Sequence, residues 1–411
     1  MIYGVNCMDK LIISKPKVCK NGEKTRLCFK ITNKSEIYDA WYEVDSKYGK
    51  YLCYERADGL VVNLLLYAME HNLNIECEQV MSDKLYYQLT EYLIPLISKN
   101  IKKYHSIKII SDVISTKIDA DNYAVGASLS GGVDSFYTLL RHINRKEKEY
   151  NITHLTFFNA GASGAYGGDY SRLRYLDRIN IINKVAKKLK LPLVCVDTNI
   201  NEFLLQGHEA THTFRTLAIP LILQKLFNKY YFASGFDVSR FCFSPTDTAK
   251  YDLLITQCIS NDMISFYLSG SEASRIDKVK YISEYDITFD SLNVCTAEST
   301  NCSKCDKCKR TMLELYALKK LDYYKYTFDI QYFFRHKHLF FAQMIGLGLW
   351  KERDDKEDWN DIYFILKKEI RFFDYIMGLL VLIYRIIRRK LYRINLFKKI
   401  YNFVVSKTAR K

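Results

Sequence analysis

Short apolar runs alternate with amphipathic segments between residues 119 and 330, and this alternation limits the folds open to the chain. The runs read YAVGASL, ITHLTFF, LPLVCVD and YYFASG, and the segments between them have helical periodicity. Strands that alternate with helices pair in parallel, because each helix carries the chain back across the sheet. The pattern predicts an α/β fold in which a parallel sheet has helices on both faces.

The regions on either side of this alternation have other patterns. Residues 1–118 combine strand-like runs such as LCFKIT and AWYEVD with two helical segments, which predicts an N-terminal α+β domain of unknown role. Residues 331–411 are aromatic, helical in period and increasingly basic, which predicts a helical C-terminal tail. We therefore divide the chain into 1–118, 119–330 and 331–411, since 411 residues exceed the usual size of one hydrophobic core.

The net charge of +15 belongs mostly to the end of the chain. From Arg385 onward there are ten basic and no acidic residues, which leaves +5 for residues 1–384. This tail predicts contact with an anionic membrane surface or an acidic partner; a helix packed on the body with its bases in water is the alternative. Nucleic acid is disfavoured as a partner, because the excess of positive charge is concentrated in the tail and is not spread over residues 1–384.

The N-terminal stretch MIYGVNCMDKLIISK has no charged lead followed by a long apolar run and a cleavage site, so we expect no signal peptide. This favours a cytoplasmic protein, with peripheral contact at the inner membrane face through the tail. In a reducing compartment, the twelve cysteines are expected to be thiols or metal ligands rather than disulfides.

A glycine loop, Ser-Gly-Gly-Val-Asp-Ser, lies between the first apolar run and the helical segment FYTLLRHI. Glycine lets the backbone approach a ligand, and a helix N-terminus offers amide hydrogens and a positive dipole. The loop is neither a Walker loop, whose lysine it lacks, nor a dinucleotide fingerprint, whose third glycine it lacks. The alternative to phosphate binding is a capped turn that only connects a strand to a helix. The predicted phosphate-binding residues are Ser130, Gly131, Gly132, Val133, Asp134 and Ser135.

Asp134 is the unusual member of this loop. A carboxylate beside phosphates is explained if it holds Mg²⁺ between them, which suits the release of pyrophosphate as a unit. As a loop residue at a phosphate site, Asp134 is expected to contribute little to stability.

Four cysteines near residue 300 have the spacing C-x6-C-x2-C-x2-C. Four thiolates this close together predict a closed, tetrahedral, structural zinc site. An iron–sulfur cluster is the competing occupant, but the Cys-Pro continuation typical of it is absent; four unrelated buried cysteines are the remaining alternative. The predicted ligands are Cys295, Cys302, Cys305 and Cys308.

The SGGVDS loop resembles that of the PP-loop ATP pyrophosphatases, and its combination with a downstream cysteine cluster resembles the 7-cyano-7-deazaguanine synthase-like proteins over about residues 123–320. The resemblance implies an adenine nucleotide alpha hydrolase-like fold with ATP, Mg²⁺ and Zn²⁺ as cofactors. It also implies an ATP-dependent ligase, in which the loop holds the leaving pyrophosphate while a substrate oxygen attacks the α-phosphate. Ammonia or another nucleophile then displaces AMP from the adenylated substrate.

The resemblance extends to two segments between the motifs. HTFRTLAIPLIL resembles the family's arginine-bearing helix start, and SRIDKVKYISEY its helix before the cysteines, so Arg215 and Lys278 are expected to act in catalysis with Asp134. The segment FDVSRFCFSPTDTAKYD departs from the family, because it lacks the Ser-Gly-Tyr-Pro-Asp-Cys type motif that reads deazaguanine. The partners expected are therefore ATP and an unidentified small-molecule acceptor, with ammonia free or delivered by a partner protein.

Two other functions stay open. Sulfur insertion into a tRNA base, the reaction of the thiolating relatives, needs a nucleophilic cysteine, for which Cys195 and Cys242 are the nearby candidates. The second open function is that of a regulator that binds a nucleotide but does not catalyse its conversion.

Two further segments are weaker candidates for a site. Four glycines in residues 159–172 are compatible with a lid over ATP or with a surface loop. The string HEATH at 208–212 matches the zinc-protease pattern, but its expected place at the junction of a loop and a helix favours a capping or substrate-facing role.

Overall fold

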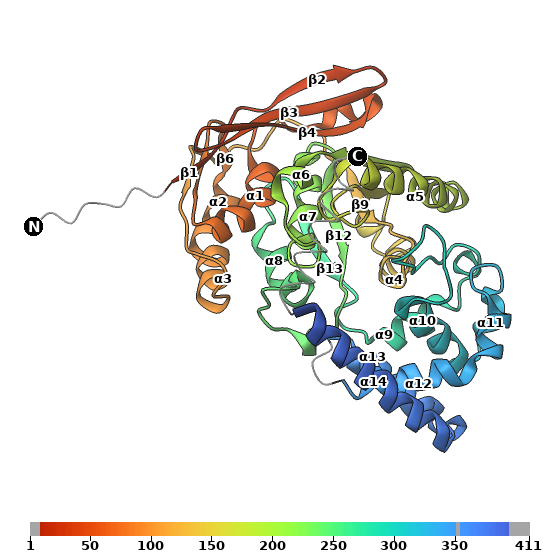
Figure 1. Cartoon of the computed structure of the whole chain (residues 1–411). Coiled ribbons are helices and arrows are strands. Elements are labelled where there is room, and N and C mark those ends of the chain that lie inside the picture. Colours follow the sequence, from red (N-terminus) through yellow and green to blue (C-terminus); the bar gives the residue numbers. More distant parts are fainter. Residues whose placement is uncertain (1–8, 351–353, 394–411) are drawn as a thin grey trace, which may run out of the picture. The chain divides into compact units, whose positions relative to one another are not determined.

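The computed structural model describes residues 9–350 and 354–393 (Figure 1). Within these residues the fold is α/β, with a mostly parallel sheet of eleven strands flanked by helices. Its parallel half contains the strands expected from the alternating apolar runs. In spatial order these are β12 (Phe227–Ala233), β9 (Ala124–Ser128), β10 (His154–Phe158) and β11 (Leu193–Thr198). One more parallel strand, β13 (Ser265–Ser269), pairs with β12 and was not among the predicted runs.

Strand β9 lies in the middle of the parallel strands and is made of small residues. At Gly126 an added Cβ would lie 2.6 Å from the ring of Tyr230 and 2.7 Å from that of Phe227, both on the neighbouring strand β12. Glycine is therefore needed at position 126, because the rings of Tyr230 and Phe227 occupy the space that a side chain would fill.

The strands from the first hundred residues continue the same sheet. Strand β4 pairs antiparallel with β11, and β3, β1, β5 and β7 follow in that order, with β2 paired to β3. Strands on both sides of residue 118 thus share one sheet; the sequence-based division there stays a prediction. The bounds are β1 (Lys10–Ile13), β2 (Lys17–Asn21), β3 (Lys24–Asn33), β4 (Glu36–Asp45), β5 (Asn74–Cys77) and β7 (Ile109–Ile110), with a separate pair β6 (Met81–Ser82) and β8 (Val113–Ile114).

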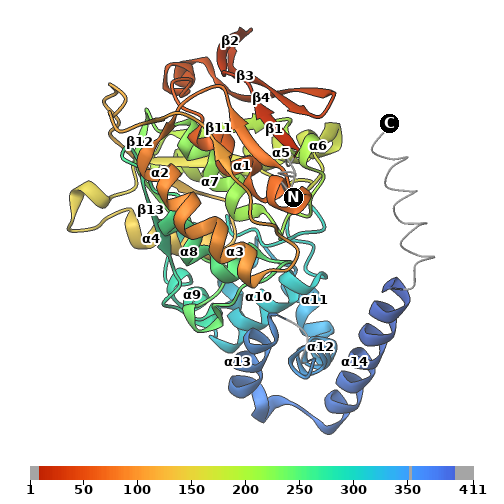
Figure 2. The same cartoon turned by 90° about the vertical axis from the view of Figure 1, so that its left-hand side faces the viewer.

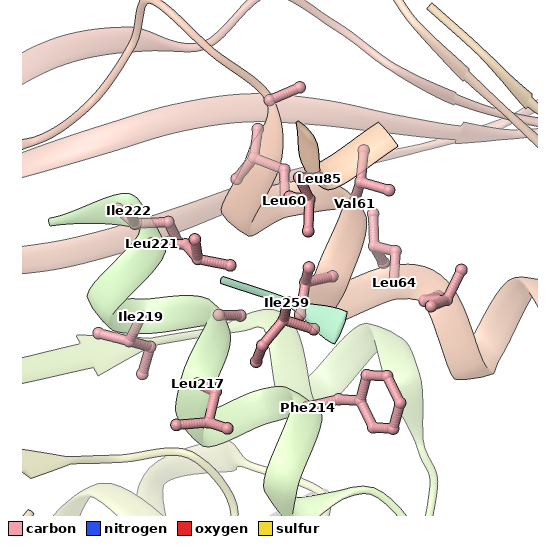
Figure 3. Close-up of a cluster of buried hydrophobic side chains, with 14 of the residues drawn as sticks. Leu60, Val61, Leu64, Leu85, Phe214, Leu217, Ile219, Leu221, Ile222 and Ile259 are labelled. Atoms are coloured by element: carbon pink, nitrogen blue, oxygen red, sulfur yellow. The ribbon is translucent and has the colours of Figure 1, made fainter. Parts of the chain in front are cut away.

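Helices α1 (Asp58–His71) and α7 (His212–Ile222) pack against each other in the main hydrophobic core. Figure 3 shows Leu60, Val61 and Leu64 of α1 with Leu217 of α7 in this cluster. The other helices around this core and sheet are α2 (Asp83–Gln88), α3 (Ile94–Asn100), α5 (Gly168–Leu189), α6 (Ile200–Leu204) and α8 (Asp252–Cys258).

The chain forms two compact units, and the sheet belongs to the first, residues 9–130 and 138–272. The second unit has residues 131–137 and the described residues from 273 onward, and it is helical. In Figure 2, α13 and α14 lie on either side of α12, which packs against both. The helices are α4 (Val133–His142), which begins in the second unit, and α9 (Arg275–Ile282), α10 (Asp306–Ala317), α11 (Ile330–Arg335), α12 (Lys337–Gly348), α13 (Lys356–Leu366) and α14 (Phe372–Arg393).

None of the helices in the described ranges combines the length and the apolar character needed to cross a membrane. Five of the ten basic residues of the predicted tail lie beyond residue 393 and so outside the described residues.

The close approach of α1 to α7 depends on Gly59. An alanine Cβ there would lie 2.6 Å from the carbonyl oxygen of Ala218 and 2.6 Å from Cγ1 of Ile222. We expect Gly59→Ala to lower the free energy of unfolding by about 1–3 kcal/mol despite the better helix propensity of alanine, because the helices must move apart. Urea unfolding of the two proteins measures this difference.

Gly207→Ala is the matched control, since nothing lies within 4 Å of a Cβ at that position. It is expected to leave the stability unchanged or slightly higher. Equal effects of the two substitutions would show that backbone freedom, rather than helix packing, decides the result.

Candidate functional site

The predicted phosphate loop connects β9 to α4, and its geometry depends on one glycine. Gly131 has φ +81°, which favours glycine. Its carbonyl oxygen accepts a hydrogen bond of 2.7 Å from the amide of Asn293. The helix then begins, with the amide of Phe136 donating to the carbonyl oxygen of Gly132 at 3.0 Å. Because that is the first turn of α4, the amides before Phe136 lie at the positive end of the helix dipole.

Asp134, in this first turn, makes ion pairs with two cations of α9. Lys278 Nζ lies 3.3 Å from Oδ1, and Arg275 Nη1 lies 3.3 Å from Oδ2. Burial disfavours the charged form of Asp134, but the positive charges of Lys278 and Arg275 outweigh this effect and hold the pKa of the carboxyl below its ordinary value. The Lys278 side chain is only 1% exposed, and a charge so far from water needs opposite charge nearby, which Asp134 provides.

Helix α9 presents both cations from one face because they are three residues apart. A capping box fixes the start of the helix: the Ser274 side chain accepts from the amide of Asp277, and the Asp277 side chain accepts from the amide of Ser274. The capped first turn therefore contains Arg275 and places it for contact with the loop.

A chain of buried charges continues from Arg275. Its Nε lies 3.4 Å from Oε1 of Glu314, a residue of α10 that is 0% exposed. Arg310 Nε approaches the same oxygen at 3.8 Å, and its Nη1 lies 2.8 Å from Oδ2 of Asp358 on α13. Positive and negative groups thus alternate from the glycine loop to α13, so each buried charge has an opposite neighbour.

The structure brings together two of the three residues expected to act in catalysis, Asp134 and Lys278. Sequence reasoning missed Arg275 and Glu314. The signal for Arg275 was its spacing of three residues from Lys278 on one predicted helix. Nothing local marked Glu314, because its partner lies on another helix.

Arg215, the third expected catalytic residue, is buried on α7 in the first unit. It donates from Nη1 to the carbonyl oxygen of Ala165 (2.8 Å) and to Oδ1 of Asn201 (3.1 Å), and from Nη2 to the carbonyl oxygen of Gln206 (3.0 Å). Burial lowers its pKa to about 10. Through its hydrogen bond to Ala165, Arg215 holds the glycine-containing segment 161–168 in place. The catalytic role of Arg215 stays a prediction.

The string HEATH lies at the start of α7, as its sequence context indicates. The rings of His208 and His212 have their centres 5.5 Å apart, and His212 Nε2 lies 3.5 Å from Oδ1 of Asp247. Asp247 caps the turn that follows it by accepting from the amide of Ala249. Among the described residues, the cysteine cluster is the group whose donors lie close enough to hold a metal ion, and these histidines are not part of it.

The four cysteines predicted as metal ligands come together. Their sulfur atoms all lie within 4.8 Å of one another, and Cys295 Sγ is 3.9 Å from Cys305 Sγ. Four sulfurs around a zinc ion at the usual bond length would be about 3.8 Å apart. The donor set fits a closed zinc site, because all four positions of a tetrahedron are filled by protein sulfur.

Backbone amides surround these sulfurs. The amide of Glu298 donates to Cys295 Sγ at 3.3 Å, that of Cys305 to Cys302 Sγ at 3.3 Å, and that of Cys308 to Cys305 Sγ at 3.5 Å. Such donors favour the thiolate, the form that binds metal. A hydrogen bond from the Cys308 thiol contributes most to a pKa of about 4 for Cys305, which is also the N-cap of α10.

Asn293 joins the cysteine cluster to the glycine loop. Its amide donates to the carbonyl oxygen of Gly131 at 2.7 Å, and its side-chain oxygen accepts from the amide of Cys295 at 3.3 Å. Asn301 closes the segment that carries the cluster, accepting from the amide of Val294 at 2.9 Å. A metal bound by the cysteines would thereby stabilise the backbone that supports Gly131.

Comparison of the chain with protein-family models, with curated proteins and with solved structures gives no match.

We expect the purified protein to contain about one zinc ion per chain, as measured by metal analysis. Cys305→Ser should lose the metal and lower the thermal midpoint, since a structural zinc contributes directly to folding. Cys242→Ser is the matched control, because Cys242 is exposed and outside the cluster. Visible absorption from an iron–sulfur cluster, or four freely titratable thiols in the folded protein, would contradict zinc.

The ion pairs of Asp134 predict a larger contribution to stability than we expected for a loop residue at a phosphate site. A carboxyl whose pKa is lower in the folded chain stabilises the fold above its unfolded pKa, about 3.9, and loses this contribution as the pH falls through the folded value. We expect Asp134→Asn to lower the free energy of unfolding at pH 7 by about 1.5–3 kcal/mol, since its ion pairs with Lys278 and Arg275 are lost. Unfolding of both proteins should show the difference shrinking below about pH 4.

Asp119→Asn removes a carboxylate from an exposed loop and serves as the control. It should change the stability little at either pH. A difference between the wild type and Asp134→Asn that stays constant down to acid pH would show that the charge of Asp134 is not what stabilises the loop.

Proposed function

We propose that the chain is a PP-loop ATP pyrophosphatase, closest to the 7-cyano-7-deazaguanine synthase-like proteins, that adenylates a substrate oxygen. The oxygen attacks the α-phosphorus of ATP, the bond to the bridging oxygen breaks, and pyrophosphate leaves with the electron pair. Ammonia or another nucleophile then attacks the activated carbon, and AMP leaves. Activation is needed because the substrate oxygen is a poor leaving group and AMP is a good one.

One observation carries the proposal: Asp134 of the glycine loop lies between Lys278 and Arg275 at the start of a helix. A helix N-terminus and two nearby cations together favour an anion of high charge, such as a polyphosphate. Arginine can bind phosphate oxygens in a bidentate way, and lysine acts as a point charge. This supports phosphate recognition over a purely structural turn, which would not need two cations.

Asp134 accounts for the selectivity of such a site. While it pairs with both cations, it offsets part of their positive charge, so weak anions gain less by binding. A nucleotide that arrives with Mg²⁺ would offer Asp134 another cation and leave Lys278 and Arg275 for the phosphates. Mg²⁺ would be held by Asp134 and would supply neutralisation of the charge on the departing pyrophosphate.

The zinc site has a structural part in this proposal. Its four ligands leave no position for a substrate, so the ion would not activate water or a carbonyl. Its effect would reach the nucleotide through Asn293, which hydrogen-bonds both to Cys295 and to Gly131.

Sulfur insertion is less well supported. Cys195 lies on β11, and burial raises the pKa of its thiol to about 11, so the nucleophilic thiolate is disfavoured at neutral pH. Cys242 is exposed and is not one of the four clustered cysteines. The acceptor, an ammonia-supplying partner and the cytoplasmic location stay predictions.

The test is the identity of the products. We expect the wild type, with labelled ATP, Mg²⁺, an ammonium salt and a metabolite extract as the source of acceptor, to form AMP and pyrophosphate. Asp134→Asn should form AMP at least 100-fold more slowly at a temperature well below its thermal midpoint, because it cannot hold the metal. Asp119→Asn should retain the wild-type rate.

Formation of ADP by the wild type would contradict adenylation, since a kinase or a simple ATPase breaks the other phosphate bond. ATP binding without AMP in any extract would favour the regulator. Lys278→Gln gives an independent check if Asp134→Asn fails to fold: it should weaken ATP binding, measured by calorimetry, while leaving Asp134 paired with Arg275.

A further inference from the structure

Helix α14 has one face that packs in the second unit and another that is exposed. On the packed face Asp374 is fully buried, and a Cβ added at Gly378 would lie 2.8 Å from Cγ2 of Ile345 on α12. Arg385 on the same face donates two hydrogen bonds, of 2.7 and 2.9 Å, to the carboxylate of Asp306. These contacts fix which side of α14 is turned outward (Figure 2).

The outward side carries an unbroken apolar stripe. Its members recur every three or four residues, which places them on one face of the helix. They are between 45% and 81% exposed, although burial is the rule for such side chains. The stripe consists of Phe372, Ile376, Leu380, Ile383, Ile387 and Leu391, and Phe373, Leu379 and Tyr384 beside it are exposed as well.

Basic residues bracket this apolar stripe at both ends. Lys367, Lys368 and Arg371 are exposed just before α14, and Arg388 and Lys390 are exposed in its last turns. The two acidic residues between positions 367 and 393 are Asp374, which is buried as described, and Glu369, which makes an ion pair of 2.5 Å with Lys337.

The end of α13 adds to the same surface. Phe364 and Ile365 are 64% and 49% exposed. The hydroxyl of Tyr363, next to them, lies 3.1 Å from that of Tyr375 on α14, so the two helices are neighbours there.

We propose that the stripe on α14 binds the surface of an anionic membrane, with the helix lying in the plane of the interface. A helix of 22 residues is about 33 Å long, and its whole exposed side is apolar with bases at both ends. Apolar side chains can enter the boundary between headgroups and acyl chains while the bases contact anionic headgroups.

A second copy of the chain is the competing occupant. Protein interfaces with an apolar centre are depleted in lysine. In a dimer formed through the stripe, the basic residues at its ends would bring like charges together, which is unfavourable. The distribution of charge therefore favours lipid.

The experiment uses the full chain and flotation with two kinds of vesicle. We expect the wild type to float with vesicles of phosphatidylcholine mixed with phosphatidylglycerol, and to bind vesicles of phosphatidylcholine alone at least tenfold more weakly. The double variant Leu380→Asp, Ile383→Asp should bind the anionic vesicles at least tenfold more weakly than the wild type, at an unchanged thermal midpoint because both side chains are exposed. Lys367→Gln, Lys368→Gln, Lys390→Gln should weaken binding and reduce its dependence on salt.

Leu173→Asp, Leu176→Asp is the matched control, since these leucines are 63% and 55% exposed on α5. It should float as the wild type does. Failure of the wild type to float, equal binding of the two aspartate double variants, or equal binding to both kinds of vesicle would overturn the proposal. A wild-type dimer in light scattering that Leu380→Asp, Ile383→Asp converts to a monomer, with no vesicle binding by either, would assign the stripe to a second copy instead.

Discussion

The ion pairs of Asp134 with Lys278 and Arg275 are the constraint on which the second unit depends most. Charges in a protein interior are costly unless each has a partner, so fixing one fixes its neighbours. Arg275 leads to Glu314, and Glu314 to Arg310, which reaches Asp358. The start of α4, then α9, α10 and α13, are thereby held in one arrangement that hydrophobic packing alone, being non-directional, would not specify.

The cysteine cluster fills a different need. The chain between residues 289 and 305 has no helix or strand, and few apolar residues there are available for a core. Such a segment gains order from cross-links rather than from buried area. The clustered sulfurs, with Asn293 and Asn301 bonded to the backbone, supply these cross-links directly behind the glycine loop. The two strongest motifs of the chain are thus parts of one structure.

The second unit has two kinds of surface with opposite requirements. Around Asp134 it keeps charges away from water, and on α14 it leaves large apolar side chains in contact with water. Both arrangements cost free energy in the isolated chain, and both would be relieved by a ligand of suitable chemistry. These are the two places where we propose binding, of a phosphate group with its metal ion around Asp134 and of an anionic membrane surface on α14.

Local patterns determined the α/β class, the run of parallel strands and the glycine turn. These follow from periodicity and from the few residues that allow a positive φ, as at Gly131. The spacing of the cysteines likewise predicted a cluster that can hold a metal ion. Zinc as its occupant is predicted from the set of four thiolates, whereas ATP and the reaction rest on the resemblance, and all three remain proposals.

The tertiary structure decided which distant groups meet. Arg275 and Glu314 lie 39 residues apart, and β4 pairs with β11 across some 150 residues, so neither contact leaves a local pattern in the sequence. The sequence likewise did not reveal which side chains of α14 are exposed, because an apolar helix has the same sequence pattern whether other elements cover its side chains or water contacts them. Periodicity reports what each segment can form, whereas pairing and burial depend on the free energy of the whole chain.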